Sequence, residues 1–379
     1  MFSKTPMTNA QPSSSTSPAR KPWAAALNPA NLAKHKAFAD VKVRHPKMQA
    51  VVEELRALLM ARTDSNIILI TGATGVGKTT LSKELSRLCA DMFKQVLEDD
   101  PSAIPAVWVE AYANGDHHHG FRSLYQDIRE ELLEPAANRK AHAEVVNGRL
   151  IMKPQARTTI DALRNVVQAG LRERKTIVCA IDEAYHLLRF ASETAVMETL
   201  KSLANTTGVK FVLIGSFDLF DLVAEHGQVA RRSMVINFDR SHLDDEADRA
   251  AFRKVVKGLQ AAWPCEEVPN FVAISDELME ACLGCVGLLK SLMLDAAAMQ
   301  MTADGKWRGA FLAKAAKSNG LRDVIRREIE TGEKKVRDAV MGVCLWNDKK
   351  LAEMEARMGA VPDGRAAAGS TKQVGVACA

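Results

Sequence analysis

The chain has 379 residues, of which 47% are hydrophobic and 26% are charged, and its formal net charge is +5. These values are typical of a globular protein that can bury one large domain and a smaller one, and they exclude a wholly disordered chain. The mild basic excess permits contact with nucleic acid or an acidic partner but does not require either.

The sequence carries no apolar stretch long enough to span a membrane, and its N-terminus lacks the apolar run of an export signal. The seven cysteines are odd in number and lie mostly within apolar runs. This pattern is typical of reduced thiols rather than of a disulfide framework. We therefore expect a soluble, cytoplasmic protein with no membrane partner.

The first segment, residues 1–39, is expected to be a disordered basic arm. Residues 1–22 are rich in Ser, Thr, Pro and Ala, and no acidic residue occurs before Asp40. A basic arm of this kind can contact DNA phosphates, although a plain solvated tail is the favoured interpretation.

The next segment, residues 40–240, alternates between helical and strand patterns. An amphipathic helix is expected after Pro46, where apolar residues recur at helical spacing. Short apolar runs predict strands at residues 66–70, 106–110, 176–181, 211–214 and 234–238. Because helical patterns lie between most of them, we predict an α/β fold with a parallel five-stranded sheet flanked by helices.

The strands stop after residue 240. Helical patterns at residues 247–262, 276–283 and 288–301 predict a small all-helical domain over residues 241–302. Residues 303–358 read as a basic helical region, and residues 359–379 as a disordered tail rich in Gly and Ala.

The most informative motif lies at residues 72–79, which match G-x-x-x-x-G-K-[ST] in full. A predicted strand precedes it and an amphipathic helix follows, as a phosphate-binding P-loop requires. Lys78 is expected to reach the β- and γ-phosphates of ATP, and the Thr79 hydroxyl to bind Mg²⁺. The expected nucleotide-binding residues are Gly72, Thr74, Gly75, Val76, Gly77, Lys78, Thr79 and Thr80.

A pair of acids, Asp182 and Glu183, directly follows the predicted strand at residues 176–181. In a P-loop protein this is the arrangement of a Walker B motif. Asp182 is expected to hold the Mg²⁺, and Glu183 to act as the general base for the attacking water.

Four further residues are candidates for the same site. Ser216 follows the predicted strand at residues 211–214, where its hydroxyl could orient the water or sense the γ-phosphate. Arg231 or Arg232 could reach the nucleotide of a neighbouring subunit and stabilise the transition state in trans. Lys290, at the end of the G-x-x-G-L-L-K stretch, could approach the γ-phosphate from the helical domain.

Together these features resemble the AAA+ ATPases, and more narrowly the TniB/TnsC group of transposition ATPases. The superfamily resemblance rests on the P-loop and the Asp-Glu pair. The segments that suggest the TniB/TnsC group are residues 200–205 (LKSLAN), 212–216 (VLIGS) and 228–233 (QVARRS), and residues 44–46 (RHP) also fit it. Within them, KSLAN and ARRS are what narrow the resemblance to this group.

That resemblance implies an AAA+ fold in which the helical domain forms a lid. It also implies a protein that assembles on duplex DNA as a ring or filament when ATP is bound. Such a protein recruits a transposase to the target site, contacts a target-selection protein and is reset by ATP hydrolysis.

Two alternatives stay open on the sequence alone. One is a different DNA-associated AAA+ protein, such as a replication-initiator or a secretion-type ATPase. The other is a nucleotide-gated scaffold with little catalysis, against which Glu183 argues because a dead site often loses its general base.

Overall fold

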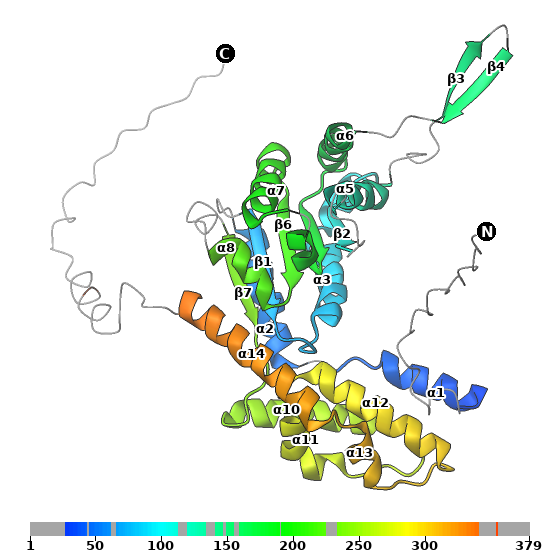
Figure 1. Cartoon of the computed structure of the whole chain (residues 1–379), viewed down its shortest axis with the longest axis vertical. Helices are drawn as coiled ribbons and strands as arrows, with labels where there is room; N and C mark the ends of the chain where they lie inside the picture. The colour runs from blue at the N-terminus through cyan, green and yellow to red at the C-terminus, as the bar shows by residue number, and fades with distance from the viewer. Residues whose placement is uncertain are drawn as a thin grey trace, which may run out of the picture.

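The computed structural model describes residues 27–43, 45–61, 66–112, 120–133, 141–146, 149–154, 159–189, 191–224, 233–340 and Met354. Within these residues a parallel sheet forms the centre of an α/β core, and a helical domain lies at one end of it (Figure 1).

The sheet has five strands in the spatial order β2-β5-β6-β1-β7, and all of its pairings are parallel. Its strands are β1 Ile67–Gly72, β2 Ala106–Glu110, β5 Val178–Asp182, β6 Lys210–Gly215 and β7 Ser233–Phe238. All five lie where the apolar runs predicted them, so the predicted fold class is confirmed. Because the strands are parallel, β1, β5 and β6 end at the same edge of the sheet, which is where α/β proteins bind ligands.

Helices cover both faces of the sheet because side chains of each strand alternate between the two. Leu69 of β1 joins the core beneath α5, α6 and α7, whereas Ile68 and Ile70 join the core beneath α2 and α3. The bounds are α2 Pro46–Met60, α3 Lys78–Met92, α5 Gly120–Glu131, α6 Ile160–Glu173 and α7 Glu193–Thr207. Short elements link them: α4 Lys94–Asp99, η2 Ala184–Arg189, η3 Phe217–Phe220 and α8 Asp221–Ala224.

An antiparallel hairpin, β3 Ala141–Val146 with β4 Arg149–Pro154, is inserted between α5 and α6. It forms a separate two-stranded sheet, and Figure 1 shows it projecting away from the core. The sequence analysis did not predict it.

The helical domain, called the lid below, follows β7 and has its own hydrophobic core. Its elements are α10 Glu246–Ala261, η4 Phe271–Ile274, α11 Ser275–Ala281, α12 Val286–Thr302 and α13 Ala310–Ala315. Several aromatic rings pack within this core, and Trp263 contacts Phe271 at a centroid distance of 4.7 Å. The predicted run of helices after residue 240 therefore folds as a compact unit.

Residues 29–39, which we expected to belong to a disordered arm, instead form most of helix α1 Pro29–Asp40. Pro29 begins the helix, and the Asn28 side chain caps it by accepting from the Asn31 amide at 2.8 Å. Phe38 is 1% exposed and meets Trp263 edge-on, so α1 is held by the lid core. The N-terminal residues of the expected arm, 1–26, lie outside the described residues.

The C-terminal helix, α14 Asn319–Val340, leaves the lid and returns to the α/β core (Figure 1). Its residues Ile329 and Val336 are 1% and 4% exposed and belong to the same core as α2 and α3. We expected only a basic helical region here, so its packing against the core is a finding of the structure. The expected tail at residues 359–379 lies outside the described residues.

The connection between core and lid depends on a glycine that tolerates no side chain. Gly284 has a φ of +71°, and a Cβ added to it would lie 1.8 Å from the Ser241 carbonyl oxygen. Both the backbone strain and this backbone clash oppose substitution. We expect Gly284→Ala to lower the free energy of unfolding by about 2–4 kcal/mol.

Chemical denaturation measures this effect, and Gly309→Ala is the matched control because a Cβ there meets nothing within 4 Å. Equal stability of the Gly284→Ala and Gly309→Ala variants would show that the connection is not constrained as described.

Candidate nucleotide-binding and hydrolysis site

The loop between β1 and α3 has the backbone of a phosphate cradle. Gly75 and Gly77 have φ values of +81° and +120°, which side chains other than glycine rarely adopt. Gly72 is needed for a different reason, since a Cβ there would lie 2.6 Å from the Phe238 carbonyl oxygen. Helix α3 begins at Lys78 without a side-chain cap, so its first amides face the loop and suit an anion.

Lys78 lies folded against its own loop. Its ammonium donates to the carbonyl oxygens of Gly72 at 2.9 Å and Ala73 at 3.0 Å. Burial lowers its pKa, and the carboxylates of Glu183 and Asp182 oppose that shift. A triphosphate in the loop would offer charged oxygens to the same ammonium, which are stronger acceptors than carbonyls.

Asp182 ends β5 and is held by two hydrogen bonds. One carboxylate oxygen accepts from the Ser82 hydroxyl at 2.7 Å, and the other accepts from the Glu183 amide at 2.9 Å. Ser82 lies one turn after Thr79 on α3. The sequence analysis missed Ser82, although its helical spacing from Thr79 was a usable signal.

Glu183 has a left-handed backbone, with a φ of +49°. Such conformations are uncommon for residues other than glycine and cluster at functional sites. Burial raises the pKa of Glu183, and the neighbouring Asp182 charge raises it further. A carboxylate with a raised pKa is a better proton acceptor, which suits a general base.

These elements border one cavity of about 550 Å³, a size typical of small-ligand sites. Glu183 and Ser216 line it from the strand ends, and Gly287 and Leu288 line it from the lid. From the P-loop come Thr74, Gly75, Gly77, Lys78, Thr79 and Thr80. Of the other predicted residues, Gly72 and Val76 shape the loop, and Asp182 lies next to Glu183.

The lid touches the P-loop directly. The Gly287 amide donates to the Gly75 carbonyl at 2.7 Å, and a Cβ on Gly287 would lie 2.5 Å from that oxygen. A Cβ on Gly75 would in turn lie 2.8 Å from Leu288. The P-loop and the start of α12 are therefore in direct backbone contact.

Lys290 does not point into this cavity. Its ammonium donates to the carbonyl oxygens of Ala39, in the last turn of α1, and Val41, which directly follows α1. Those contacts hold the chain between α1 and α2 to the lid. The expectation that Lys290 approaches the γ-phosphate therefore disagrees with this structure, where the lid contributes Gly287 and Leu288 instead.

Of the three remaining candidates, Ser216 borders the cavity. The Ser216 hydroxyl lines the cavity and lies 3.4 Å from an Asp218 carboxylate oxygen. Arg231 and Arg232 lie outside the described residues. Tyr185, Asp218 and Glu328 also line the cavity, and the sequence analysis assigned none of them to the site.

A magnesium ion fits the chemistry of the oxygen donors here. Mg²⁺ prefers one or two protein oxygens together with phosphate oxygens and water. Thr79 supplies a hydroxyl at the cavity, and Asp182 supplies a carboxylate whose orientation Ser82 fixes. Each Asp182 oxygen accepts one described hydrogen bond, which leaves a lone pair for a metal or its bound water.

No helix among the described residues is long and apolar enough to cross a bilayer.

Comparisons with known proteins agree with this geometry. Residues 61–223 match the family model described as "AAA domain". The chain is similar in structure to the ORC2 protein of Aeropyrum pernix (ADPNP-ADP complexes), with 15% identity over 74% of this chain and 71% of that chain, and a TM-score of 0.51.

A second similar structure is the Aeropyrum pernix ORC1 protein in complex with DNA. The identity is 14%, the match covers 86% of this chain and 75% of that chain, and the TM-score is 0.51. At such low identity the likeness shows the fold alone. None of the curated proteins matches the sequence. From residue 61 to residue 223 the chain thus matches an AAA domain, and it has the P-loop AAA+ fold.

Proposed function

We propose that this chain binds Mg·ATP in the cavity between the P-loop, the strand ends and the lid, and hydrolyses it. The observation that carries the proposal is that Lys78, Thr79, Glu183 and Ser216 border one cavity, although they come from three separate segments. The strand-end geometry, in which Ser82 orients Asp182, supports the same conclusion.

Each residue has a distinct role in this proposal. Lys78 and the loop amides bind the β- and γ-phosphates, while Thr79 and Asp182 hold the Mg²⁺, which neutralises phosphate charge when bound. Glu183 accepts the proton of the attacking water, and Ser216 orients that water or contacts the γ-phosphate. Arg231 or Arg232 acts in trans on the nucleotide of a neighbouring subunit.

For the cellular role, the first candidate is a transposition regulator of the TniB/TnsC kind. It is supported by the sequence segments at residues 200–205, 212–216 and 228–233. In this role the chain assembles on duplex DNA with ATP, recruits a transposase, contacts a target-selection protein and is reset by hydrolysis. The cytoplasmic location expected from the sequence stays a prediction.

The second candidate is a replication-initiator ATPase. It is favoured by the likeness in fold to the two Aeropyrum ORC proteins, one of which was solved in complex with DNA. Both candidates place the chain on duplex DNA, and they differ in whether the DNA sequence matters. Binding through phosphates is blind to base sequence, whereas an initiator must find its site.

A DNA assembly experiment tests whether ATP controls assembly on DNA and which of the two roles the chain has. We expect the purified full chain to form rings or filaments on duplex DNA with ATP but not with ADP, as seen by electron microscopy and sedimentation. Indifference to competitor duplexes of unrelated sequence supports the transposition role, and preference for one sequence supports the initiator role. Identical behaviour with ATP and ADP would reject nucleotide-controlled assembly on DNA.

A further inference from the structure

The C-terminal helix α14 is anchored over the edge of the sheet that carries the candidate site. Ile329 and Val336 are buried in the core with α2 and α3, and Ile325 packs against it. At Gly332 the helix approaches so closely that an added Cβ would lie 2.1 Å from the Phe217 ring. Phe217 begins η3, directly after Ser216, so α14 packs beside the cavity.

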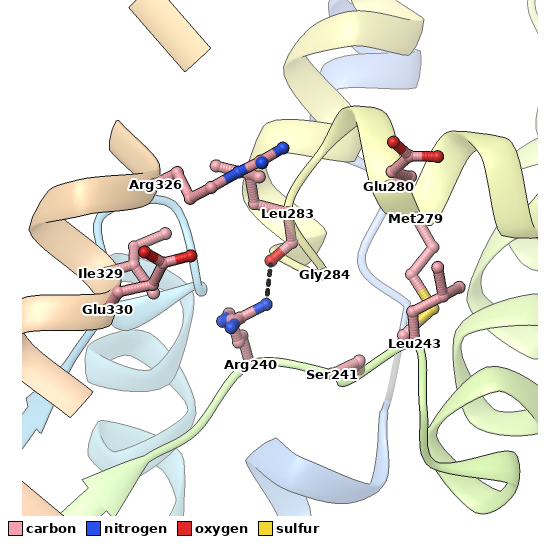
Figure 2. Close-up of a pocket in the computed structure, with 10 residues that line it drawn as sticks. All are labelled: Arg240, Ser241, Leu243, Met279, Glu280, Leu283, Gly284, Arg326, Ile329 and Glu330. Carbon is pink, nitrogen blue, oxygen red and sulfur yellow. Dashed lines mark hydrogen bonds between the residues drawn. The ribbon is translucent and has the colours of Figure 1, made fainter. Parts of the chain in front are cut away.

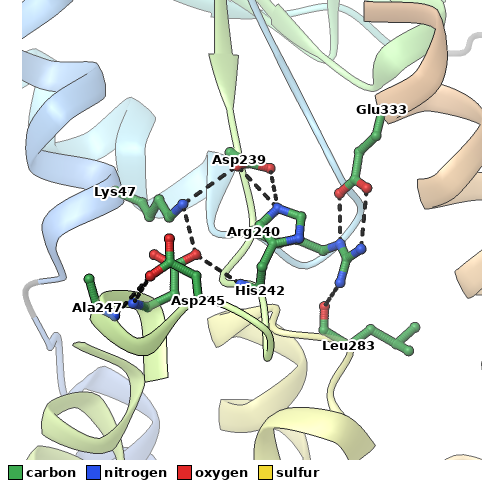
Figure 3. A network of polar contacts seen from close by, with 9 residues as sticks. Lys47, Asp239, Arg240, His242, Asp245, Ala247, Leu283 and Glu333 are labelled. Carbon is green, nitrogen blue, oxygen red and sulfur yellow. Dashed lines mark hydrogen bonds and ion pairs between the residues drawn. The ribbon is translucent and has the colours of Figure 1, made fainter. Parts of the chain in front are cut away.

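Beyond its apolar contacts, the helix borders a pocket and forms ion pairs in its second half. On its lid-facing side, Arg326 and Ile329 border a pocket of about 190 Å³ opposite Leu283 and Gly284 (Figure 2). One turn further, Glu333 accepts from Arg240 Nε at 2.6 Å and Nη2 at 3.2 Å (Figure 3).

Arg240 is well placed to couple the helix to the lid. It lies in the connection between β7 and α10, and it also donates to the Leu283 carbonyl of the lid at 3.3 Å (Figure 3). Its paired bonds to Glu333 have the fork geometry that makes Arg–carboxylate contacts strong, and both side chains are mostly shielded from solvent. Beyond this pair, Lys335 forms an ion pair with Asp221 of α8. The helix is therefore clamped at the junction between core and lid.

This docking places Glu328 at the phosphate cavity. Its carboxylate lines the cavity and accepts from the Thr74 hydroxyl of the P-loop at 3.1 Å. Among the described residues that line this cavity, Lys78 is the cation, whereas Glu183, Asp218 and Glu328 are acids. In the proposed mechanism Glu183 has a role in hydrolysis, but the Glu328 carboxylate lies against the P-loop and repels the phosphate charge that would bind there.

We propose that α14 is an autoinhibitory strap. When the helix is docked, Glu328 accepts the hydrogen bond of the Thr74 hydroxyl and adds negative charge where the phosphates bind. Nucleotide binding and strap docking then oppose each other. Because such coupling is reciprocal, ATP loosens the strap to the same extent that the strap weakens ATP binding. The inference rests on the proposed nucleotide site and adds to it a control by the C-terminal helix.

The test measures ATP affinity of the full-length protein by calorimetry. Glu328→Gln keeps the shape of the side chain but removes its charge, and Glu328 is exposed, so the fold should tolerate the change. We expect this variant to bind ATP roughly tenfold more tightly than the wild type. Glu330→Gln is the matched control, since Glu330 lies on the same helix and outside the phosphate cavity.

Two further measurements separate a strap from a local charge effect. Glu333→Gln weakens the Arg240 contact without touching the cavity, and it should also tighten ATP binding. In the wild type, amide hydrogen exchange over residues 319–337 should become faster when ATP is bound, because ATP loosens the docked helix.

Equal or weaker ATP binding by Glu328→Gln would overturn the proposal; weaker binding would mean that Glu328 helps to hold the nucleotide or its metal. Exchange over α14 that is unchanged or slower with ATP would overturn it as well. If Lys78→Ala loses ATP binding while Glu328→Gln matches the wild type, the nucleotide site stands and only the strap is rejected.

Discussion

Replacing Glu183 with Gln should lower steady-state ATP hydrolysis by about 10²- to 10³-fold while ATP binding persists. Glu183 lines the phosphate cavity directly after Asp182, and its raised pKa favours uptake of a proton from water. A glutamine keeps the shape of the side chain but cannot take that proton. Phosphate release measures the turnover, and calorimetry measures the binding.

Glu198→Gln is the control for this variant, since Glu198 is exposed on α7 and away from the cavity. If assembly on DNA depends on bound ATP, the Glu183→Gln assemblies should also outlast those of the wild type. Unchanged turnover in the Glu183→Gln protein would mean that another group activates the water. Negligible turnover in the wild type itself would favour the nucleotide-gated scaffold.

Replacing Lys78 with Ala should weaken ATP binding by at least about 100-fold. Charge-assisted contacts to phosphate are among the strongest polar interactions, and removing one from a partly buried site costs about 3 kcal/mol or more. Among the described residues that line the cavity, Lys78 alone carries a positive charge, so none of the others replaces that charge in the variant. Lys83→Ala is the control, because Lys83 is exposed on the same helix.

The P-loop and the strand ends could be predicted from sequence because their signals are local. Apolar runs fixed β1, β5 and β6, and parallel pairing brings their ends together. Glycines in a fixed spacing then identify the loop, since Gly75 and Gly77 need conformations that other residues avoid. Fold class and phosphate site follow from these few short segments.

The direction of single side chains was not predictable in the same way. The G-x-x-G-L-L-K stretch correctly places a helix at the P-loop, but helical rotation turns Lys290 toward Ala39 and Val41. Which face of α12 meets α1 depends on the packing of the whole lid. No motif spacing carries that information.

Contacts between distant segments were missed for a related reason. Thr74 and Glu328 are 254 residues apart, and their contact depends on how α14 returns to the core. The spacing of Ile325, Ile329 and Val336 does indicate an apolar helix face, but the sequence analysis identified only a basic helical region there.

Two other signals were present and overlooked. An Asn followed by a Pro is a common signal for the start of a helix, with the Asn as N-cap and the Pro at the first helical position. Asn28 and Pro29 have these positions in α1. In the sequence, the segments of β3 and β4 lie on either side of an Asn-Gly pair. An Asn-Gly pair between two strand segments is the strongest short-range signal for a hairpin.

The central claim is that the glycine loop grips a triphosphate through Lys78. Equilibrium binding of ATP to the wild-type and Lys78→Ala proteins, measured side by side with Mg²⁺ present, tests it most directly. The account predicts saturable binding by the wild type that is lost in the variant. ATP uptake by Lys78→Ala equal to that of the wild type would contradict it.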